Sequence, residues 1–224
     1  MLVKDVMTPN PITVRPGSDP LAGVAICKSG GFSRLPVVDD DGKLIGIVTE
    51  NDLKLFLSTA PSPGVMKRQH RMDQVMRSPA ISISPDYPLE EAARVMVKHN
   101  ITGLPVVDET NHLVGIITHS DIFAQLADTL GAETDSLRVT VQVPNRPGEL
   151  AKLADRIAQA GANICSVVTH CAIDCDKEDG RINLTLRLEG TTLDDIASVI
   201  RQDPAVEILY AWQRKSPPPE ANGA

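Results

Sequence analysis

Aromatic residues, basic runs and long apolar stretches are all scarce in this sequence of 224 residues. Aromatic residues make up 3% of the chain and apolar residues 42%, so cores must be built from Val, Ile, Leu and Ala, which suits sheets covered by helices. The formal net charge is −7, and without a long basic run we expect binding to neither nucleic acid nor an anionic membrane. No stretch approaches the ~18 apolar residues of a membrane span, and no signal-peptide pattern opens the chain. We therefore expect a cytoplasmic protein.

Catalytic and metal-binding motifs are lacking as well. The four cysteines form no Cys-x-x-Cys pair, so we expect small apolar thiols in a reducing compartment rather than disulfides. Strand alternation divides the potential metal ligands near residue 170: His170 points one way, and the face expected to pack against helices carries Cys165, Val167, Cys171 and Cys175. We expect no metal site. The sequence contains no nucleophile elbow, Walker loop, dinucleotide fingerprint or His-Glu-x-x-His, so we expect a binding protein and not an enzyme.

An internal duplication dominates the N-terminal part of the sequence. The stretch Gly46–Leu53 recurs as Gly115–Ile122, and both copies contain Gly-x-x-Thr-x-x-Asp. Leu-Pro-Val-Val-Asp precedes each copy at the same distance, at 35–39 and at 104–108. A fixed offset shared by two motifs indicates a tandem repeat.

Each repeat is predicted to contain a strand, a helix, a hairpin and a second helix. In the first repeat we expect strands at 12–14, 35–38 and 44–48, a helix at about 20–30 with Leu21, Val24, Ala25 and Lys28 on one face, and a helix starting at Thr49. Asp-Gly at 41–42 favours the hairpin turn. In the second repeat we expect a strand at 81–83, a helix with Leu89, Ala92, Ala93, Met96 and Val97 on its apolar face, and a hairpin turn at 109–112. The segment 59–71 is the predicted linker.

The pattern changes after Gly131 to strand-helix-strand-strand-helix-strand, the ferredoxin-like order. We expect strands at 137–143, 164–172, 182–188 and 206–212. The first helix is marked by Leu150, Leu153, Ala154, Ile157 and Ala158, and the second by Leu193, Ile196, Ala197 and Ile200. Thr191 or Thr192 is the expected N-cap of the second helix. The segment 214–224 is predicted to be a disordered tail.

These residues resemble two known families. The repeated unit, at 1–58 and 72–130, resembles the CBS motif, and two such motifs normally pack as one pair, a Bateman module. The segment 136–213 resembles an ACT domain through the turn Arg146–Leu150 and the strand entry Ala162–Ile164. A CBS pair followed by an ACT domain resembles the acetoin utilisation protein B type of bacterial regulator. The implied fold class is α/β (α+β): tandem CBS motifs followed by a ferredoxin-like βαββαβ domain.

The Thr-x-x-Asp sequence at each strand-to-helix junction has two interpretations. A helix N-terminus favours an anion, and a carboxylate one turn in can accept both hydroxyls of a ribose. The alternative is a capping box, in which the acidic side chain returns to the N-cap amide. The CBS resemblance implies two sites for an adenosyl ligand. The first comprises Thr13, Val14, Arg34, Leu35, Pro36, Thr49 and Asp52. The second comprises Ser82, Ile83, Gly103, Leu104, Pro105, Thr118 and Asp121.

The two copies differ in charge. Arg34 stands where the CBS family often places a phosphate-contacting residue, whereas Gly103 holds that place in the second repeat. Arg15 and Lys54 also lie near the first motif. We therefore expect the first site to take AMP, ADP or ATP, and the second to hold no ligand or a less charged one such as S-adenosylmethionine. Arg34 as an ordinary surface residue is the alternative.

The ACT resemblance implies a free amino acid bound at a dimer interface, between the turn and the entry of the next strand. The implied contacts are Asn145, Gly148, Glu149, Leu150, Asn163 and Ile164. Asn145 stands where an Asp is common, so pure dimerisation is the alternative. Together these features predict a homodimeric regulatory sensor of an adenine nucleotide, without a catalytic cofactor, that acts on an unidentified protein target. The rival is a ligand-free assembly module.

Overall fold

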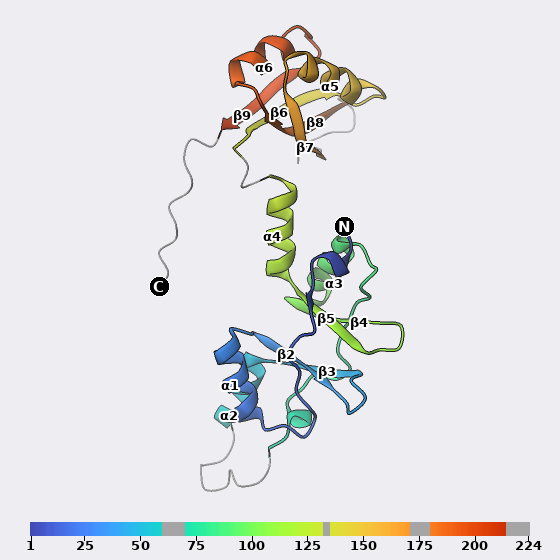
Figure 1. The fold of residues 1–224 in the computed structure, drawn as a ribbon, viewed down its shortest axis with the longest axis vertical. Helices are drawn as coiled ribbons and strands as arrows, with labels where there is room; N and C mark the ends of the chain where they lie inside the picture. The colour runs from blue at the N-terminus through green and yellow to red at the C-terminus, as the bar shows by residue number, and fades with distance from the viewer. Residues whose placement is uncertain (60–69, 132–134, 171–179, 214–224) are drawn as a thin grey trace. The chain divides into compact units, whose positions relative to one another are not determined.

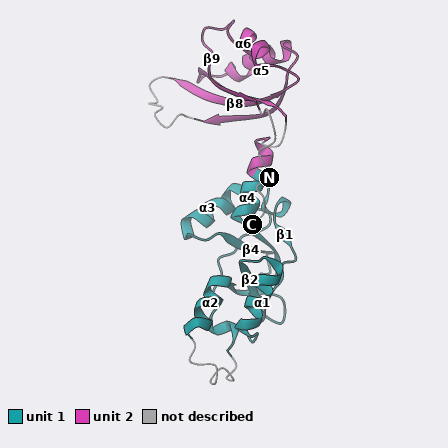
Figure 2. Cartoon of the chain, turned by 90° about the vertical axis from the view of Figure 1, so that its left-hand side faces the viewer, with its two compact units in different colours: residues 1–125 teal, residues 126–224 magenta. Residues whose placement is uncertain are grey.

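The computed structural model describes residues 1–59, 70–131, 135–170 and 180–213. The chain divides into two compact units, residues 1–125 and 126–224 (Figure 2). Most of the predicted linker, Cys171 and Cys175, and the C-terminal tail lie outside the described residues. Within the described ranges, no helix combines the length and apolar character needed to cross a bilayer.

Unit 1 contains the two repeats apart from the last residues of α4, with the same order of elements in each repeat (Figure 1). The first repeat consists of α1 (Pro20–Gly30), β2 (Arg34–Val38), β3 (Leu44–Thr49) and α2 (Glu50–Thr59). The second consists of α3 (Leu89–His99), β4 (Gly103–Val107), β5 (Leu113–Thr118) and α4 (His119–Thr129). A short leader precedes each repeat: η1 (Val3–Asp5) with β1 (Thr8–Pro9) in the first, and η2 (Met72–Gln74) in the second.

The two hairpins have equivalent registers. Arg34 pairs with Thr49 in the first hairpin, and Gly103 pairs with Thr118 in the second, so the two pairs occupy corresponding positions of the duplicated sequence. Each hairpin also carries an irregularity at its Val-Val step. The predicted hairpins are therefore confirmed, and the duplication extends to the pairing of individual residues.

The predicted strands at 12–14 and 81–83 are wrong in extent. Each is reduced to a single parallel β-bridge, Val14 to Val37 and Ile83 to Val106. Val14 donates its N–H to the carbonyl of Pro36 and accepts from Val38, and pairing ends there. Prolines stand close on both sides of each bridge, and a proline has no N–H with which to extend a ladder.

The apolar faces of two helices differ from their predicted positions. Leu21 is 60% exposed, and α1 instead buries Pro20, Gly23, Val24 and Cys27. Asp19 is the N-cap of this helix, and its side chain accepts the backbone N–H of Leu21. On α3, Val97 is 83% exposed while Ala92 and Met96 are buried. Single exposed apolar residues are common on protein surfaces. A residue whose spacing matches the apolar face of a helix can still lie at the edge of that face, exposed to solvent.

The leader of each repeat packs into the core of the other repeat. Val3 is fully buried among second-repeat residues such as Leu104 and Ile117, and Met72 is fully buried among first-repeat residues such as Leu35 and Leu53. The backbone follows the same exchange, because β1 pairs with β5 and Arg77 forms a bridge with Ile47 on β3. Each core is therefore completed by a segment that the sequence assigns to its neighbour.

The glycine of the repeated Gly-x-x-Thr motif makes this exchange possible. A Cβ on Gly46 would lie 2.8 Å from the sulfur of Met76 and 3.0 Å from the carbonyl oxygen of Arg77. At Gly115 the corresponding neighbours are Met7 and Thr8. Only a residue without a side chain lets the opposite leader cross the strand so closely.

Unit 2 has the predicted ferredoxin-like order. Its elements are β6 (Leu137–Pro144), α5 (Glu149–Gln159), β7 (Asn163–His170), β8 (Arg181–Glu189), α6 (Leu193–Ile200) and β9 (Glu207–Gln213). The strands form an antiparallel sheet in the order β7-β8-β6-β9, and α5 and α6 lie together on one face (Figure 1). Leu153 and Ile157 of α5 pack with Ile196 of α6 against the apolar side chains of β6 and β8. Thr192 is the N-cap of α6 and forms a capping box with Asp195.

The predicted packing of β7 is wrong at Cys165. This thiol is exposed, and Val167 is also exposed at the edge of the sheet. The register between β7 and β8 shifts between Ile164 and Ser166, so Cys165 is the extra residue of a bulge. A bulge changes the alternation of side chains along a strand, and here Ile164 packs against the core.

Candidate functional site

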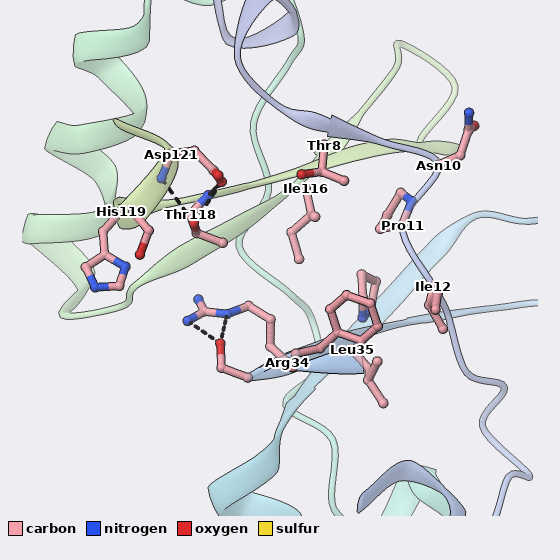
Figure 3. A pocket seen from close by; sticks show the side chains of 15 residues that line it. Thr8, Asn10, Pro11, Ile12, Arg34, Leu35, Ile116, Thr118, His119 and Asp121 are labelled. Atoms are coloured by element: carbon pink, nitrogen blue, oxygen red, sulfur yellow. Dashed lines mark hydrogen bonds between the residues drawn. The ribbon is translucent and has the colours of Figure 1, made fainter. Parts of the chain in front are cut away.

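A cavity of about 360 Å³ lies within unit 1, where the two repeats meet (Figure 3). The leader of the first repeat and the start of β2 contribute Thr8, Asn10, Pro11, Ile12, Gly31, Phe32, Ser33, Arg34, Leu35 and Pro36. The second repeat contributes Ile116, Thr118, His119, Ser120 and Asp121 from the junction of β5 and α4. We call this cavity the Asp121 cleft. Its volume is within the range of about 300–1,000 Å³ that small-molecule sites occupy.

Asp121 uses one carboxylate oxygen to cap α4. Its Oδ2 accepts the N–H of Thr118 at 2.7 Å and the hydroxyl of Thr118 at 2.7 Å. Among the described residues, its Oδ1 has no hydrogen-bond partner, and Figure 3 shows the side chain at the wall of the cleft. The capping interpretation and the binding interpretation are therefore compatible at this residue, because they use different oxygens.

Arg34 forms part of the opposite wall of the cleft (Figure 3). Its guanidinium donates to the hydroxyl of Thr102 and, at 3.3 Å, to the hydroxyl of Ser33. It lies over Gly103, where an added Cβ would collide with it. Burial lowers the pKa of Arg34, yet an arginine remains charged at neutral pH. This wall therefore presents a positive charge held by two neutral hydroxyl groups.

The start of α4 adds a second feature that favours an anion. His119 and Ser120 occupy the first turn of the helix and line the cleft. The His119 ring is held edge-on to Phe123, with centroids 6.0 Å apart. The N-terminal end of a helix carries a partial positive charge, so the cleft has positive character at both Arg34 and α4.

Asp52 has the same cap as Asp121 but a different partner for its second oxygen. Its Oδ2 accepts the hydroxyl of Thr49 at 2.6 Å, and its Oδ1 accepts from the guanidinium of Arg77 at 3.0 Å. Burial raises the pKa of Asp52, but the hydrogen bonds from Thr49 and Arg77 and the charge of Arg77 outweigh it and lower the pKa overall. Both oxygens of Asp52 are thus satisfied by the protein itself.

The structure groups the predicted site residues differently from the two predicted sites. Arg34, Leu35 and Pro36 share a cleft with Thr118 and Asp121 of the other repeat and not with Thr49 and Asp52. The two repeats pack so that the start of β2 lies opposite the junction of β5 and α4, and the Arg34 guanidinium donates to Thr102 of the second repeat. Arg15 and Lys54 are paired with Asp40 and Glu50.

Several residues predicted for the sites lie elsewhere. Val14 and Leu104 are buried in the cores of the two repeats, and Thr13 and Pro105 are not among the residues that line the Asp121 cleft. Ser82 and Ile83 line a different cavity, of about 370 Å³, with Tyr87, Glu91, Arg94 and Asp108. Gly103 lies against the guanidinium of Arg34 but does not line the Asp121 cleft.

Sequence reasoning missed much of the cleft wall, including the leader residues Thr8 and Asn10 and the helix residue Ser120. A signal for the leader residues was present, because the Val-Met pair before Thr8 recurs before Arg77. That recurrence marks the leader as part of the repeated unit. It does not indicate that the leader crosses to the other repeat.

The predicted amino-acid site of unit 2 is partly occupied by internal contacts. Glu149 has a side chain only 5% exposed, and its Oε1 accepts from Arg146 at 2.8 Å and from Lys152 at 2.9 Å. Gly148 has φ +91°, a conformation that favours glycine. Asn145 donates its N–H to the carbonyl of Gly180, Leu150 and Asn163 are exposed, and Ile164 is half-buried. Glu149 therefore stabilises the turn and does not face solvent.

Two family models match this chain. The CBS domain model matches residues 3–59 and 72–128, and the model for the TTHA0829-like ACT domain matches residues 136–208. A CBS domain-containing protein of Dictyostelium discoideum is 33% identical over 136 residues, which are 58% of this chain and 94% of that protein.

Several enzymes also match this chain through part of their length. Homoserine O-acetyltransferase of Methanococcoides burtonii is 36% identical over 120 residues, which are 54% of this chain but 23% of the enzyme. Inosine-5′-monophosphate dehydrogenase of Methanocaldococcus jannaschii is 29% identical over 215 residues, 93% of this chain and 39% of the enzyme. The chain thus matches less than half of either enzyme.

Solved structures give the same assignment. The CBS domain pair of protein MJ0100, in complex with 5′-methylthioadenosine and S-adenosyl-L-methionine, is 31% identical with a TM-score of 0.51, over 57% of this chain and 97% of that one. CBSX2 in complex with AMP is 27% identical with a TM-score of 0.50, over 57% and 96%. A structure described as a putative acetoin utilization protein (AcuB) from Vibrio cholerae is 30% identical with a TM-score of 0.52, over 59% and 95%. The chain therefore belongs to the CBS domain family, as a CBS pair followed by an ACT-like domain, and resembles the acetoin utilisation type.

Proposed function

We propose that this protein is a non-catalytic regulatory sensor that binds an adenine nucleotide or another adenosyl compound in the Asp121 cleft. The observation that carries the proposal is the carboxylate oxygen Oδ1 of Asp121, which lines the cleft and has no partner among the described residues. A carboxylate oxygen in this position can accept a hydrogen bond from a ribose hydroxyl. Such charge-assisted bonds are stronger than bonds between neutral groups.

The remaining walls suit the other parts of a nucleotide. Ile12 and Ile116 offer apolar surface for a purine ring. Arg34 and the start of α4 favour a phosphate. The CBS pairs that this chain resembles were solved with AMP in one case and with 5′-methylthioadenosine and S-adenosyl-L-methionine in the other. We favour AMP or a related nucleotide for the Asp121 cleft because of its positive walls.

Unit 2 is proposed to form a homodimer and to bind a free amino acid at the turn of residues 145–150. Its β7 and β9 are edge strands of the sheet, and an exposed edge can pair with a second copy of the chain. The bound nucleotide would then influence an as yet unidentified protein target through the dimer. We assign no enzymatic activity, since the chain matches only 23% of homoserine O-acetyltransferase and 39% of inosine-5′-monophosphate dehydrogenase.

A ligand-free assembly module is the alternative function, and the ion pair of Arg77 and Asp52 favours it at the first motif. Calorimetry separates the two. Protein stripped of bound ligand is titrated with AMP, ATP and S-adenosylmethionine, and the sensor function predicts heat with at least one of them. No heat with any of the three supports the assembly module.

Asp121→Asn is the first test of the binding site. The change keeps the shape of the side chain but removes a charge-assisted bond worth roughly 1.5–3 kcal/mol, so we expect AMP affinity to fall about ten- to a hundredfold. Asp52→Asn is the matched control and should change the affinity less than about twofold, because Arg77 already holds that carboxylate. Unchanged affinity in Asp121→Asn would mean that Asp121 acts only as a helix cap.

A further inference from the structure

The two halves of unit 1 place different side chains at corresponding positions around their Thr-x-x-Asp motifs. Thr8 and Arg77 occupy equivalent leader positions, each directly after a Val-Met pair. Both are held on the opposite repeat in the same way: Thr8 is aligned with Ile116 on β5, and Arg77 exchanges backbone hydrogen bonds of 2.8 and 3.0 Å with Ile47 on β3. The side chains of Thr8 and Arg77 therefore start from equivalent points beside the two carboxylates.

These two side chains have opposite consequences. Thr8 is short and lines the Asp121 cleft without a hydrogen bond to Asp121. The longer Arg77 reaches Asp52, with its Nη2 atom 3.0 Å from Oδ1. The Asp52 side chain is 22% exposed and that of Arg77 is 68% exposed, so the guanidinium covers the carboxylate from the solvent side.

The neighbouring positions are also different. Arg34 supplies a positive charge to the Asp121 cleft, whereas its counterpart Gly103 supplies none. At the start of the two helices, His119 corresponds to Glu50, which is paired with Lys54 at 2.7 Å. A phosphate beside Asp52 would therefore meet a carboxylate where the Asp121 cleft offers an imidazole.

We infer that Arg77 closes the Asp52 motif to ligands by taking the place of the ribose hydroxyls, so that unit 1 binds one adenosyl ligand, in the Asp121 cleft. This inference rests on the proposed function. It adds the number of adenosyl ligands that unit 1 binds and names Arg77 as the residue that determines this number. The duplicated motif thus serves two purposes: one copy holds the ligand, and the other is held shut by an ion pair within the chain.

The same geometry predicts how the Asp52 motif can be opened. Arg77→Thr gives the second leader the residue that the first leader already has, so the variant resembles the Asp121 cleft at this position. The exposed Arg77 side chain makes no other hydrogen bond among the described residues, and the fold should tolerate its loss. Glu50 would remain, and for that reason 5′-methylthioadenosine, which has no phosphate, is the appropriate probe.

The experiment is calorimetric titration of stripped protein with AMP and with 5′-methylthioadenosine. Wild type should bind one equivalent per chain, and Arg77→Thr should bind two equivalents of 5′-methylthioadenosine. Arg77→Ala should also bind two, and serves if Arg77→Thr does not fold. The double variant Arg77→Thr/Asp52→Asn should return to one equivalent, since the new site needs the carboxylate.

The possible results separate the inference from the proposed function. Wild type that binds two equivalents of either ligand, or Arg77→Thr and Arg77→Ala variants that both bind one, would overturn the role of Arg77 while leaving the Asp121 cleft intact. Wild type that binds neither ligand would overturn the proposed function itself. A second equivalent that appears in Arg77→Thr and disappears in the double variant supports the inference.

Discussion

Thr118 and Asp121 form a helix cap with one carboxylate oxygen and leave the other at the wall of a cleft. Thr49 and Asp52 form the same cap, but Arg77 takes the second oxygen. The Thr-x-x-Asp motif accounts for the cap in both copies because the two residues of the cap are only three positions apart in the sequence. Whether the second oxygen can bind a ligand depends on a residue that is 25 positions away from Asp52 in the chain.

Glu149 shows a second residue whose role depends on its surroundings. Its hydrogen bonds with Lys152 and Arg146 lower the pKa of the carboxyl, and this effect exceeds the opposite effect of burial. A carboxylate with a lowered pKa contributes stability above its unfolded pKa of about 4.3 and loses that contribution as the pH falls through its folded pKa. The carboxylate therefore stabilises the turn at neutral pH but not in acid.

Glu149→Gln should lower the midpoint of urea unfolding at pH 7, and its effect should shrink as the pH falls below about 4. Glutamine has nearly the same shape and does not titrate, so the variant isolates the charge. Urea unfolding followed by the fluorescence of Trp212 measures the effect, because Trp212 is the only tryptophan of the chain and lies in β9 of unit 2. A difference that stays constant between about pH 7 and about pH 3 would contradict this account.

At the scale of elements, the exchange of leaders is the feature that builds the cleft. Pattern and spacing predicted the helix at about 20–30, the helix marked by Leu89 to Val97 and both hairpins, because these depend on side chains close together in the sequence. They did not predict that η1 would pack into the core of the second repeat and η2 into the core of the first. The leaders are short, and their few apolar residues suit either core. Pattern and spacing also did not indicate that Arg34 would share a cleft with Asp121 and not with Asp52.

Met72→Ala tests this exchange directly. Met72 is fully buried in the core of the first repeat, so the change should lower the free energy of unfolding of unit 1 by roughly 2–5 kcal/mol. Amide hydrogen exchange should increase more in α1 and β2 than in α3 and β4. Val97→Ala is the control, because that side chain is 83% exposed and its loss should change stability by no more than about 0.5 kcal/mol. Greater exchange in α3 and β4 would mean that η2 packs on its own repeat.

At the scale of the whole molecule, two units with separate cores lie on one chain. The core of unit 2 is formed by residues between Leu137 and Ile200, whereas the two cores of unit 1 contain residues between Val3 and Ile117. All the residues that line the Asp121 cleft belong to unit 1. A ligand that binds only the native state of unit 1 stabilises that unit by about 2.7 kcal/mol at a hundred times its dissociation constant.

AMP should therefore raise the unfolding temperature of unit 1 more than that of unit 2. Far-UV circular dichroism reports both units, and Trp212 fluorescence reports unit 2, so thermal unfolding followed by both signals distinguishes them. We expect the dichroism transition of unit 1 to move up with AMP while the fluorescence midpoint moves less. Equal shifts in both signals would mean that the two units unfold as one cooperative block.

The sequence by itself determined the duplication, both hairpins, the helix caps and the ferredoxin-like order of unit 2. These features follow from contacts between neighbouring residues and from the periodicity of apolar side chains. Only the tertiary structure decided which Thr-x-x-Asp motif faces Arg34, because this depends on how the two repeats pack together. It also decided which core receives each leader, which the sequence does not record because the two cores are similar. It also decided that Arg77 pairs with Asp52 while Thr8 leaves Asp121 accessible, since both outcomes depend on the reach of a side chain across that crossing.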